Sequence, residues 1–340
     1  MAERARFSRA GWLALPAFAA LSFLGSWAQV FPRSFVENTY SRGIYPKIAA
    51  LAAHFADAIS FSWLDVFIPI GLIALIAAVR LKRYRLLANG VAALYLFFFW
   101  SWGLNYHREA LADKLPSDVS RTDAKALDTF AREIARNLNR LYPIQQARPH
   151  DEQAIREEAV RRVSHVTAVI DGAEWRGSSR IKHSVIANPW FHAASIDGVF
   201  NLFAHEPVVS DTLLDFEQPF AMTHELGHVY GYAGEGDANL IAVLATLMSS
   251  DPRMQYSGWI NLWFYARTPK LDALLDPGPR QDMERMFNRL RSERIRWLSA
   301  LQTAILDWYL KSNAVHEGVQ SYDQVVVLAA STQPYWDRYR

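Results

Sequence analysis

The 340-residue chain contains no cysteine, so no part of its fold depends on a disulfide bond. No internal repeat and no low-complexity tract interrupts the sequence. The chain also lacks a segregated basic region, because its 36 Lys and Arg residues are interleaved with 34 Asp and Glu residues, for a formal net charge of +2. Nucleic-acid-binding proteins gather positive charge on one face or stripe, so we expect no nucleic acid among the partners of this protein.

Charge is scarce in the first 106 residues, where three apolar runs each reach the length of a membrane span. Residues 10–31 carry no charge over 22 positions, residues 59–79 carry only Asp65, and residues 86–106 are rich in aromatic side chains. About 20 apolar residues suffice for a transmembrane helix. We therefore expect a membrane domain at residues 1–106 with three transmembrane helices, each matching one run.

The basic residues around these runs predict an orientation. Arg4, Arg6 and Arg9 precede the first run, and a basic link at residues 80–85 separates the second from the third. Because Lys and Arg favour the cytoplasmic side, residues 107–340 would form one domain outside the cytoplasm. The alternative is that the first run is a cleaved signal peptide, which would leave the large domain on the same side.

The most specific motif is the HExxH pattern His224-Glu225-Leu226-Gly227-His228. On a helix, residues four apart lie on the same face, so both imidazoles can reach one ion, while Glu225 leans towards the open coordination position. Zinc suits this set, because imidazole nitrogens and a carboxylate are its usual ligands. We expect this helix to begin near Pro219 and to end near Gly231. The alternative is a core helix with two hydrogen-bonded histidines.

A third protein ligand is expected just after the motif. The longer HExxHxxGxxH pattern ends on a third histidine, but that position here is Gly234, which has no side chain. Glu235 and Asp237 follow at the start of a second helix. We favour Glu235 as the ligand, with Asp237 as the second choice and Asn239 as a supporting group behind the ligands. Both acids could instead merely favour the positive N-terminal end of that helix.

The run HELGHVYGYAGEGDAN resembles the HELAHxxGFxxExEAN signature of a bacterial family of uncharacterised, membrane-anchored HExxH proteins. It is similar, more distantly, to the gluzincin metallopeptidases, including the CAAX prenyl protease group. The resemblance implies that His224, His228 and Glu235 are metal ligands and that Glu225 is catalytic. It also implies a multi-pass protein of the bacterial inner membrane, with its large domain facing the periplasm or the exterior. The chain departs from the bacterial family at Asp237, where that family often has Glu, and from the prenyl protease group at Asn239, where that group has Asp.

For the large domain the resemblance implies a zincin-like α+β fold. The sequence patterns predict that this fold is mostly α-helical and has a small sheet. Helices are expected at residues 122–142 and 151–170, a long one at 281–313, and a last one from 317 through 330. Short strands are expected at residues 181–187 and 198–203. A free strand edge there could pair with an extended peptide, although an edge covered by a loop is the alternative.

These features predict a membrane-anchored zinc metallopeptidase that contacts the lipid bilayer, binds Zn²⁺ and cleaves a peptide or protein substrate. Membrane-associated chains are among the candidate substrates. Glu225 would take the proton of a zinc-activated water as that water attacks the peptide carbonyl. A hydrogen-bond donor for the resulting oxyanion is expected as well. The resemblance favours Tyr322, with His316 and Tyr256 as other candidates. Two alternatives are a zinc amidohydrolase acting on cell-wall peptides and a tethered binding protein with a structural metal.

Overall fold

The computed structural model describes residues 11–116, 122–172, 180–313 and 325–340. This part of the chain is mostly helical, with one antiparallel sheet of two strands. Its elements, in chain order, are η1 (Gly11–Leu13), α2 (Ala14–Trp27), α3 (Arg33–Phe35), η2 (Val36–Ile44), α4 (Tyr45–Ala56), α5 (Leu64–Arg80), α6 (Tyr84–Ser101), η3 (Gly103–His107), α7 (Leu111–Lys114), α8 (Ala124–Gln146), α9 (Glu152–Asp171), α10 (Asn188–Ala194), β1 (Gly198–Asn201), β2 (Glu206–Val209), α11 (Gln218–Val229), α12 (Glu235–Leu247), α13 (Pro252–Ala266), α14 (Pro269–Asp272), α15 (Pro277–Glu293), α16 (Arg296–Ser312), α17 (Val325–Thr332) and η6 (Gln333–Tyr339).

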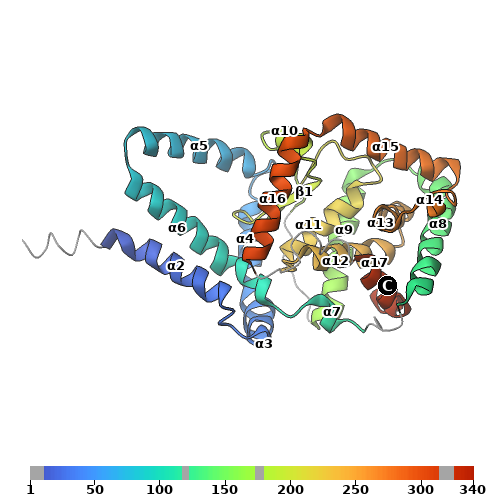
Figure 1. Ribbon diagram of the computed structural model, residues 1–340, viewed down its shortest axis with the longest axis horizontal. Helices are drawn as coiled ribbons and strands as arrows, with labels where there is room; N and C mark the ends of the chain where they lie inside the picture. Colours follow the sequence, from blue (N-terminus) through green and yellow to red (C-terminus); the bar gives the residue numbers. More distant parts are fainter. Residues whose placement is uncertain (1–10, 117–121, 173–179, 314–324) are drawn as a thin grey trace, which may run out of the picture.

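The three apolar runs near the N-terminus form helices α2, α5 and α6, which extend from one end of the molecule (Figure 1). Their lengths are 14, 17 and 18 residues, whereas a membrane span needs about 20 apolar residues. Among the described residues, no helix combines the length and the apolar character that crossing a bilayer requires. The prediction of three transmembrane helices is therefore wrong, and so is the predicted multi-pass location in the bacterial inner membrane.

The three runs are longer than the helices that they form, because each run also includes a turn or a 3-10 segment that its composition does not reveal. α2 ends at Trp27, and the chain then turns at Gln29, which has a positive φ of 49°. α5 begins only at Leu64, after the turn that opens the second run. The end of the third run, Gly103–His107, is a 3-10 helix with four of its five residues buried. The extent of an apolar run in the sequence therefore does not show where its helix begins or ends.

The hydrophobic core extends across the expected domain boundary at residue 106. One cluster of buried side chains joins Tyr45, Phe99 and Trp102 to Leu138 on α8 and Leu244 on α12. The N-terminal third thus packs directly on the part of the chain that contains the HExxH motif.

Helix α11, which carries the motif, lies in the middle of the molecule (Figure 1). Eleven of its 12 residues are buried, and it contacts α9, α12, α13 and both strands. The absence of a side chain at Gly227 lets α12 approach closely, because a Cβ there would lie 3.3 Å from the Cα of Ala238. The predicted ends are confirmed, with Pro219 in the first turn and the chain reversing at Gly231, where φ is +80°.

The sheet differs in part from the prediction. β1 confirms a strand within residues 198–203, and it pairs antiparallel with β2, which was not predicted. Residues 181–187 form no strand and make only one bridge, between Lys182 and Val208. Pro189 follows these residues in the first turn of helix α10, where proline is well tolerated.

The predicted helices at residues 122–142 and 151–170 are confirmed as α8 and α9. The single helix expected at residues 281–313 is instead two helices, because Arg294 and Ile295 adopt extended backbone conformations between α15 and α16. This break lets α16 cross the middle of the molecule at a steep angle to α15 (Figure 1). Of the helix expected from residue 317, the described part is α17, and residues 314–324 lie outside the described residues.

Candidate metal centre and its cleft

Three side chains from α11 and α12 point their ligand atoms at one place. The Nε2 atoms of His224 and His228 are 3.2 Å apart. The Oε2 atom of Glu235 lies 3.2 Å from Nε2 of His224 and 3.6 Å from Nε2 of His228. Each of these residues thus offers one atom to a common centre, as the sequence predicted for a metal site.

These distances fit a tetrahedral zinc site. Zinc binds imidazole nitrogen and carboxylate oxygen at about 2.0–2.1 Å, so two ligands of a regular tetrahedron are separated by about 3.3 Å. The three measured separations, 3.2, 3.2 and 3.6 Å, lie close to that value. The three residues therefore fit a zinc ion without rearrangement and could leave its fourth position to water.

The other ring nitrogen of each histidine fixes which nitrogen carries the proton. Nδ1 of His224 lies 2.9 Å from Oδ1 of Asn239, and Nδ1 of His228 lies 2.8 Å from the carbonyl oxygen of Tyr232. Both oxygens can only accept a hydrogen bond, so both Nδ1 atoms donate. Each Nε2 atom then faces Glu235, and its lone pair becomes available to a metal ion once that nitrogen has lost its proton. Asn239 has the supporting position that was expected.

The charges of the site agree with this arrangement. Burial alone would raise the pKa of Glu235, but His228 and His224 hold it well below its usual range. Burial alone would lower the pKa of His228, but the Glu235 carboxylate outweighs it and raises that pKa to about 9. Glu235 is thus ionised and attracts positive charge.

Glu225 lies beside this group and lines the same cleft. Its Oε2 is buried and has no hydrogen-bond partner among the described residues. Burial raises the pKa of Glu225 to about 7, near the value that suits a general base at neutral pH. The start of β1 touches this side chain, because a Cβ on Gly198 would lie 2.8 Å from both Cγ and Oε1 of Glu225.

The candidate ligands and Glu225 open into a cleft of about 600 Å³ between β1, α10, α11, α13, α15 and α16. A volume of this size is typical of small-ligand and peptide sites. Its walls are mainly apolar and aromatic, and their larger members are Trp190, Ile196, Phe200, Phe220, Phe264 and Leu306. Burial of an apolar substrate side chain in this cleft would therefore be favourable, because its apolar surface would be removed from water.

One edge of β1 lies along this cleft. Ser210 N donates to Asp197 O over 2.9 Å, and hydrogen-bonded pairs alternate along an antiparallel ladder. Phe200 consequently faces Pro207 at a position without such a bond, which suits proline because it has no N–H. The main-chain groups of Gly198 and Phe200 then point away from β2, and both residues line the cleft.

A tyrosine that the sequence did not single out lines the cleft next to the metal ligands. Tyr309, on α16, is near enough to Glu235 for that carboxylate to help raise its pKa, although burial is the larger cause and a hydrogen bond with Tyr106 opposes the rise. Tyr309 is thus a protonated donor at neutral pH. No local spacing links it to the HExxH motif, so only the packing of α16 reveals it.

The structure does not bring the other candidate donors to the cleft. Tyr256 donates to Oδ2 of Asp282 over 2.9 Å and is buried in the core. Tyr322 and His316 lie outside the described residues. Asp237, the second choice for the third ligand, accepts from the main-chain N of Leu111 instead of joining the metal group.

The His205-Glu206 pair ahead of the motif belongs to the core rather than to the cleft. The ring of His205 packs against Tyr45 and Phe200. Glu206 is fully buried, forms an ion pair of 2.9 Å with Lys182 and accepts from Ser62. We infer that this pair stabilises the fold.

Together, the fold and the site define a mostly helical protein with a His₂Glu candidate metal centre at the base of an apolar cleft. A family model described as "Protein of unknown function (DUF3810)" matches residues 40–330, so the chain belongs to the DUF3810 family. No curated protein matches the chain, and no solved structure matches it.

Proposed function

We propose that this protein is a zinc-dependent peptidase. The proposal rests on the convergence of the ligand atoms of His224, His228 and Glu235 on one point. Beside them lies the buried carboxylate of Glu225, whose Oε2 has no hydrogen-bond partner among the residues that the structure describes. In HExxH peptidases these are the parts that hold the ion and activate water. The bacterial gluzincin-like signature in the sequence supports the same activity.

The residues of the cleft would divide the reaction among them. Zinc, held by His224, His228 and Glu235, would act as a Lewis acid that polarises the substrate carbonyl and lowers the pKa of a water. Glu225 would accept a proton from that water as the water attacks the carbonyl carbon, and would later pass it to the leaving amine. Tyr309 would donate a hydrogen bond to the developing oxyanion.

The strand edge beside the cleft supports a peptide as the substrate class. The N–H and C=O groups of Gly198 and Phe200, which point away from β2 and have no hydrogen-bond partner in the described part of the chain, could bond an extended chain that lies along β1. Because Gly198 also touches Glu225, a peptide bound there would pass directly over the catalytic carboxylate. The apolar walls favour substrates with bulky apolar side chains near the scissile bond.

The decisive experiment combines metal analysis with a cleavage assay. Purified wild-type protein should contain one zinc per chain and should cleave a library of apolar peptides, with the products identified by mass spectrometry. Glu235→Gln should lose most of the zinc, whereas Asp237→Asn, a matched change two residues away, should retain it. Glu225→Gln should retain zinc and lose activity by at least about 100-fold.

Two outcomes would overturn the proposal. Wild-type protein that binds no metal would leave the three side chains as a buried polar cluster only. A zinc-loaded protein whose Glu225→Gln variant behaves like the wild type in every assay would instead be a binding protein with a structural metal.

A further inference from the structure

A second cavity lies far from the zinc-ligand end of α12. It has a volume of about 740 Å³ and lies between α9, the C-terminal end of α12 and the start of α13. Since α12 begins with the candidate ligand Glu235 and ends at Leu247, and an α-helix rises about 1.5 Å per residue, this helix separates the two sites by roughly 18 Å. The cavity shares no lining residue with the cleft.

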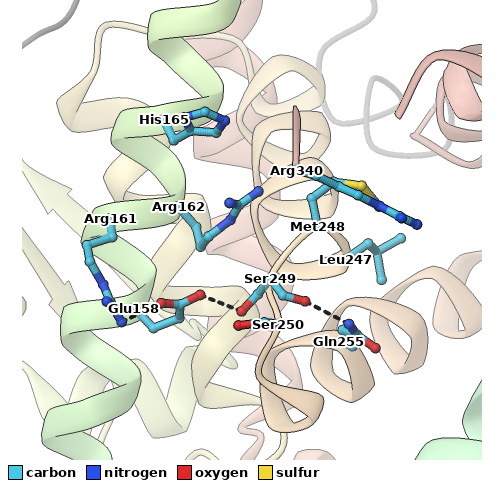
Figure 2. A pocket seen from close by; sticks show the side chains of 10 residues that line it. All are labelled: Glu158, Arg161, Arg162, His165, Leu247, Met248, Ser249, Ser250, Gln255 and Arg340. Carbon is cyan, nitrogen blue, oxygen red and sulfur yellow. Dashed lines mark hydrogen bonds and ion pairs between the residues drawn. The ribbon is translucent and has the colours of Figure 1, made fainter. Parts of the chain in front are cut away.

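The lining of this cavity is rich in cationic side chains (Figure 2). Its titratable side chains are three arginines, a histidine and a single carboxylate side chain, namely Arg161, Arg162, Arg340, His165 and Glu158. Glu158 is already engaged, since Oε2 accepts from Arg161 over 2.6 Å and Oε1 accepts from Ser249 over 2.5 Å. The negative charge of Glu158 is therefore balanced mainly by Arg161. The positive charges of the other arginines in the lining remain largely unbalanced by Glu158.

Arg162 is the least compensated of these cations. Its guanidinium donates to the main-chain carbonyl oxygen of Tyr339, a neutral acceptor. Its Nε atom is buried and has no hydrogen-bond partner among the described residues. Burial lowers the pKa of Arg162, and the attraction of Glu158 offsets only part of that effect. A half-buried guanidinium without a carboxylate of its own is costly to fold unless an anion binds it.

The surrounding groups fit an oxyanion. Arg162 and His165 point from α9 into the space that Arg340 and Ser249 border from the other side (Figure 2). Arg340 is exposed, and its one ion-pair partner among the described residues is an exposed Asp337, so its guanidinium can turn towards a ligand. Planar guanidinium groups bind phosphate through paired hydrogen bonds, which a halide ion cannot accept. Leu247 and Met248 give the cavity an apolar side as well.

We propose that this cavity binds the phosphate group of a small molecule, with Arg162 as its principal ligand-binding residue. The phosphate could be the free ion or a monoester, and both present the same charged oxygens to Arg162. The site is separate from the proposed peptidase centre and does not depend on it.

The test is a calorimetric titration of the full-length protein with inorganic phosphate and, in a parallel arm, with glycerol 3-phosphate. We expect saturable binding of at least one of the two, weakened at least about tenfold in Arg162→Gln. The better-bound compound identifies the source of the phosphate. The matched control is Arg132→Gln, which removes an exposed arginine of α8 that is paired with Asp128, and it should bind like the wild type.

A second variant guards against a folding defect, because Arg162→Gln also removes the hydrogen bond to Tyr339. His165 is exposed, so His165→Glu should fold normally while adding negative charge to the cavity, and it should abolish binding. The inference is overturned if wild-type protein shows no saturable binding to either compound, or if chloride at equal ionic strength competes as well as phosphate. It is also overturned if both variants bind like the wild type.

Discussion

Tyr45 donates its hydroxyl hydrogen to the main-chain carbonyl oxygen of Val229, 2.6 Å away, and so joins the start of α4 to the last turn of the HExxH helix. Trp102 donates to the neighbouring carbonyl of His228, and Arg108 donates to that of Gly231. The last carbonyl groups of a helix have no partner within the helix. Side chains from the N-terminal third therefore add donors at the end of the HExxH helix and hold this helix in place.

The first prediction concerns this contact. Tyr45→Phe keeps the ring but leaves the Val229 carbonyl buried without its donor, which should lower the free energy of unfolding by about 1–3 kcal/mol. Chemical denaturation would measure the loss. Tyr84→Phe is the control, because Tyr84 is 59% exposed and should change stability by less than about 0.5 kcal/mol. Equal stability of the two variants would show that the contact contributes nothing.

The second prediction concerns Tyr309. If its hydroxyl stabilises the oxyanion, Tyr309→Phe should lower kcat by about 100-fold and leave KM nearly unchanged, since the bond would form mainly in the transition state. Zinc content should be that of the wild type. Tyr335→Phe, a change on the C-terminal 3-10 helix η6, serves as the comparison. A rise in KM at constant kcat would assign Tyr309 to substrate binding instead.

The third prediction uses the close approach of β1 to the proposed catalytic carboxylate of Glu225. In Gly198→Ala, the new methyl group would collide with Glu225 at 2.8 Å, so that side chain must move. We expect activity to fall at least about tenfold, because a displaced base loses its alignment with the water, while zinc content stays constant. Gly71→Ala should have no effect, since nothing lies within 4 Å of its new Cβ. An active Gly198→Ala variant would argue against Glu225 as the base.

The fourth prediction is a pH dependence of stability that arises from His205. Burial lowers the pKa of this side chain from 6.5 to about 4. Between these values the unfolded chain binds a proton that the folded chain does not, so stability should rise with pH across this interval. The contribution is complete above pH 6.5 and is lost as the pH falls towards 4, with a maximum of about 3 kcal/mol.

The variant His205→Asn isolates this effect from the titration of carboxylates. Asparagine tolerates the positive φ of 52° found at this position. Denaturation curves at pH 4.5 and pH 7 should differ more for the wild type than for the variant. The same pH dependence in both proteins would assign the effect to other groups.

The ligand set of the candidate metal centre was predictable because it depends on local spacing. His224 and His228 are one helical turn apart, and Glu235 follows after a short reversal, so the sequence itself brings the three together. Tyr309 was not predictable, because it reaches the cleft only through the break at Arg294–Ile295 that reorients α16.

For the N-terminal helices, by contrast, the sequence did not show how long each helix is. Composition correctly indicated helices at the three apolar runs, but the turn at Gln29 and the late start of α5 shortened them below the length of a membrane span. The missed strand β2 contains Pro207, which usually argues against a strand, and it is tolerated because it faces Phe200 at a position without a hydrogen bond. The residue that a proline faces across the sheet decides whether the proline fits in a strand, and composition alone does not show that pairing.

The short reversal at Gly231 also bears on how strongly the fold would depend on the proposed zinc ion. Only six residues separate His228 from Glu235, so an ion bound to the three ligands closes a very small loop and restricts few conformations of the unfolded chain. An unfolded chain could even retain part of its affinity, which reduces the stabilisation gained by binding. The ion would thus link residues that are close in sequence and whose positions the surrounding buried side chains already fix. Chelation should therefore abolish activity and yet leave a folded apoprotein that regains function when zinc returns.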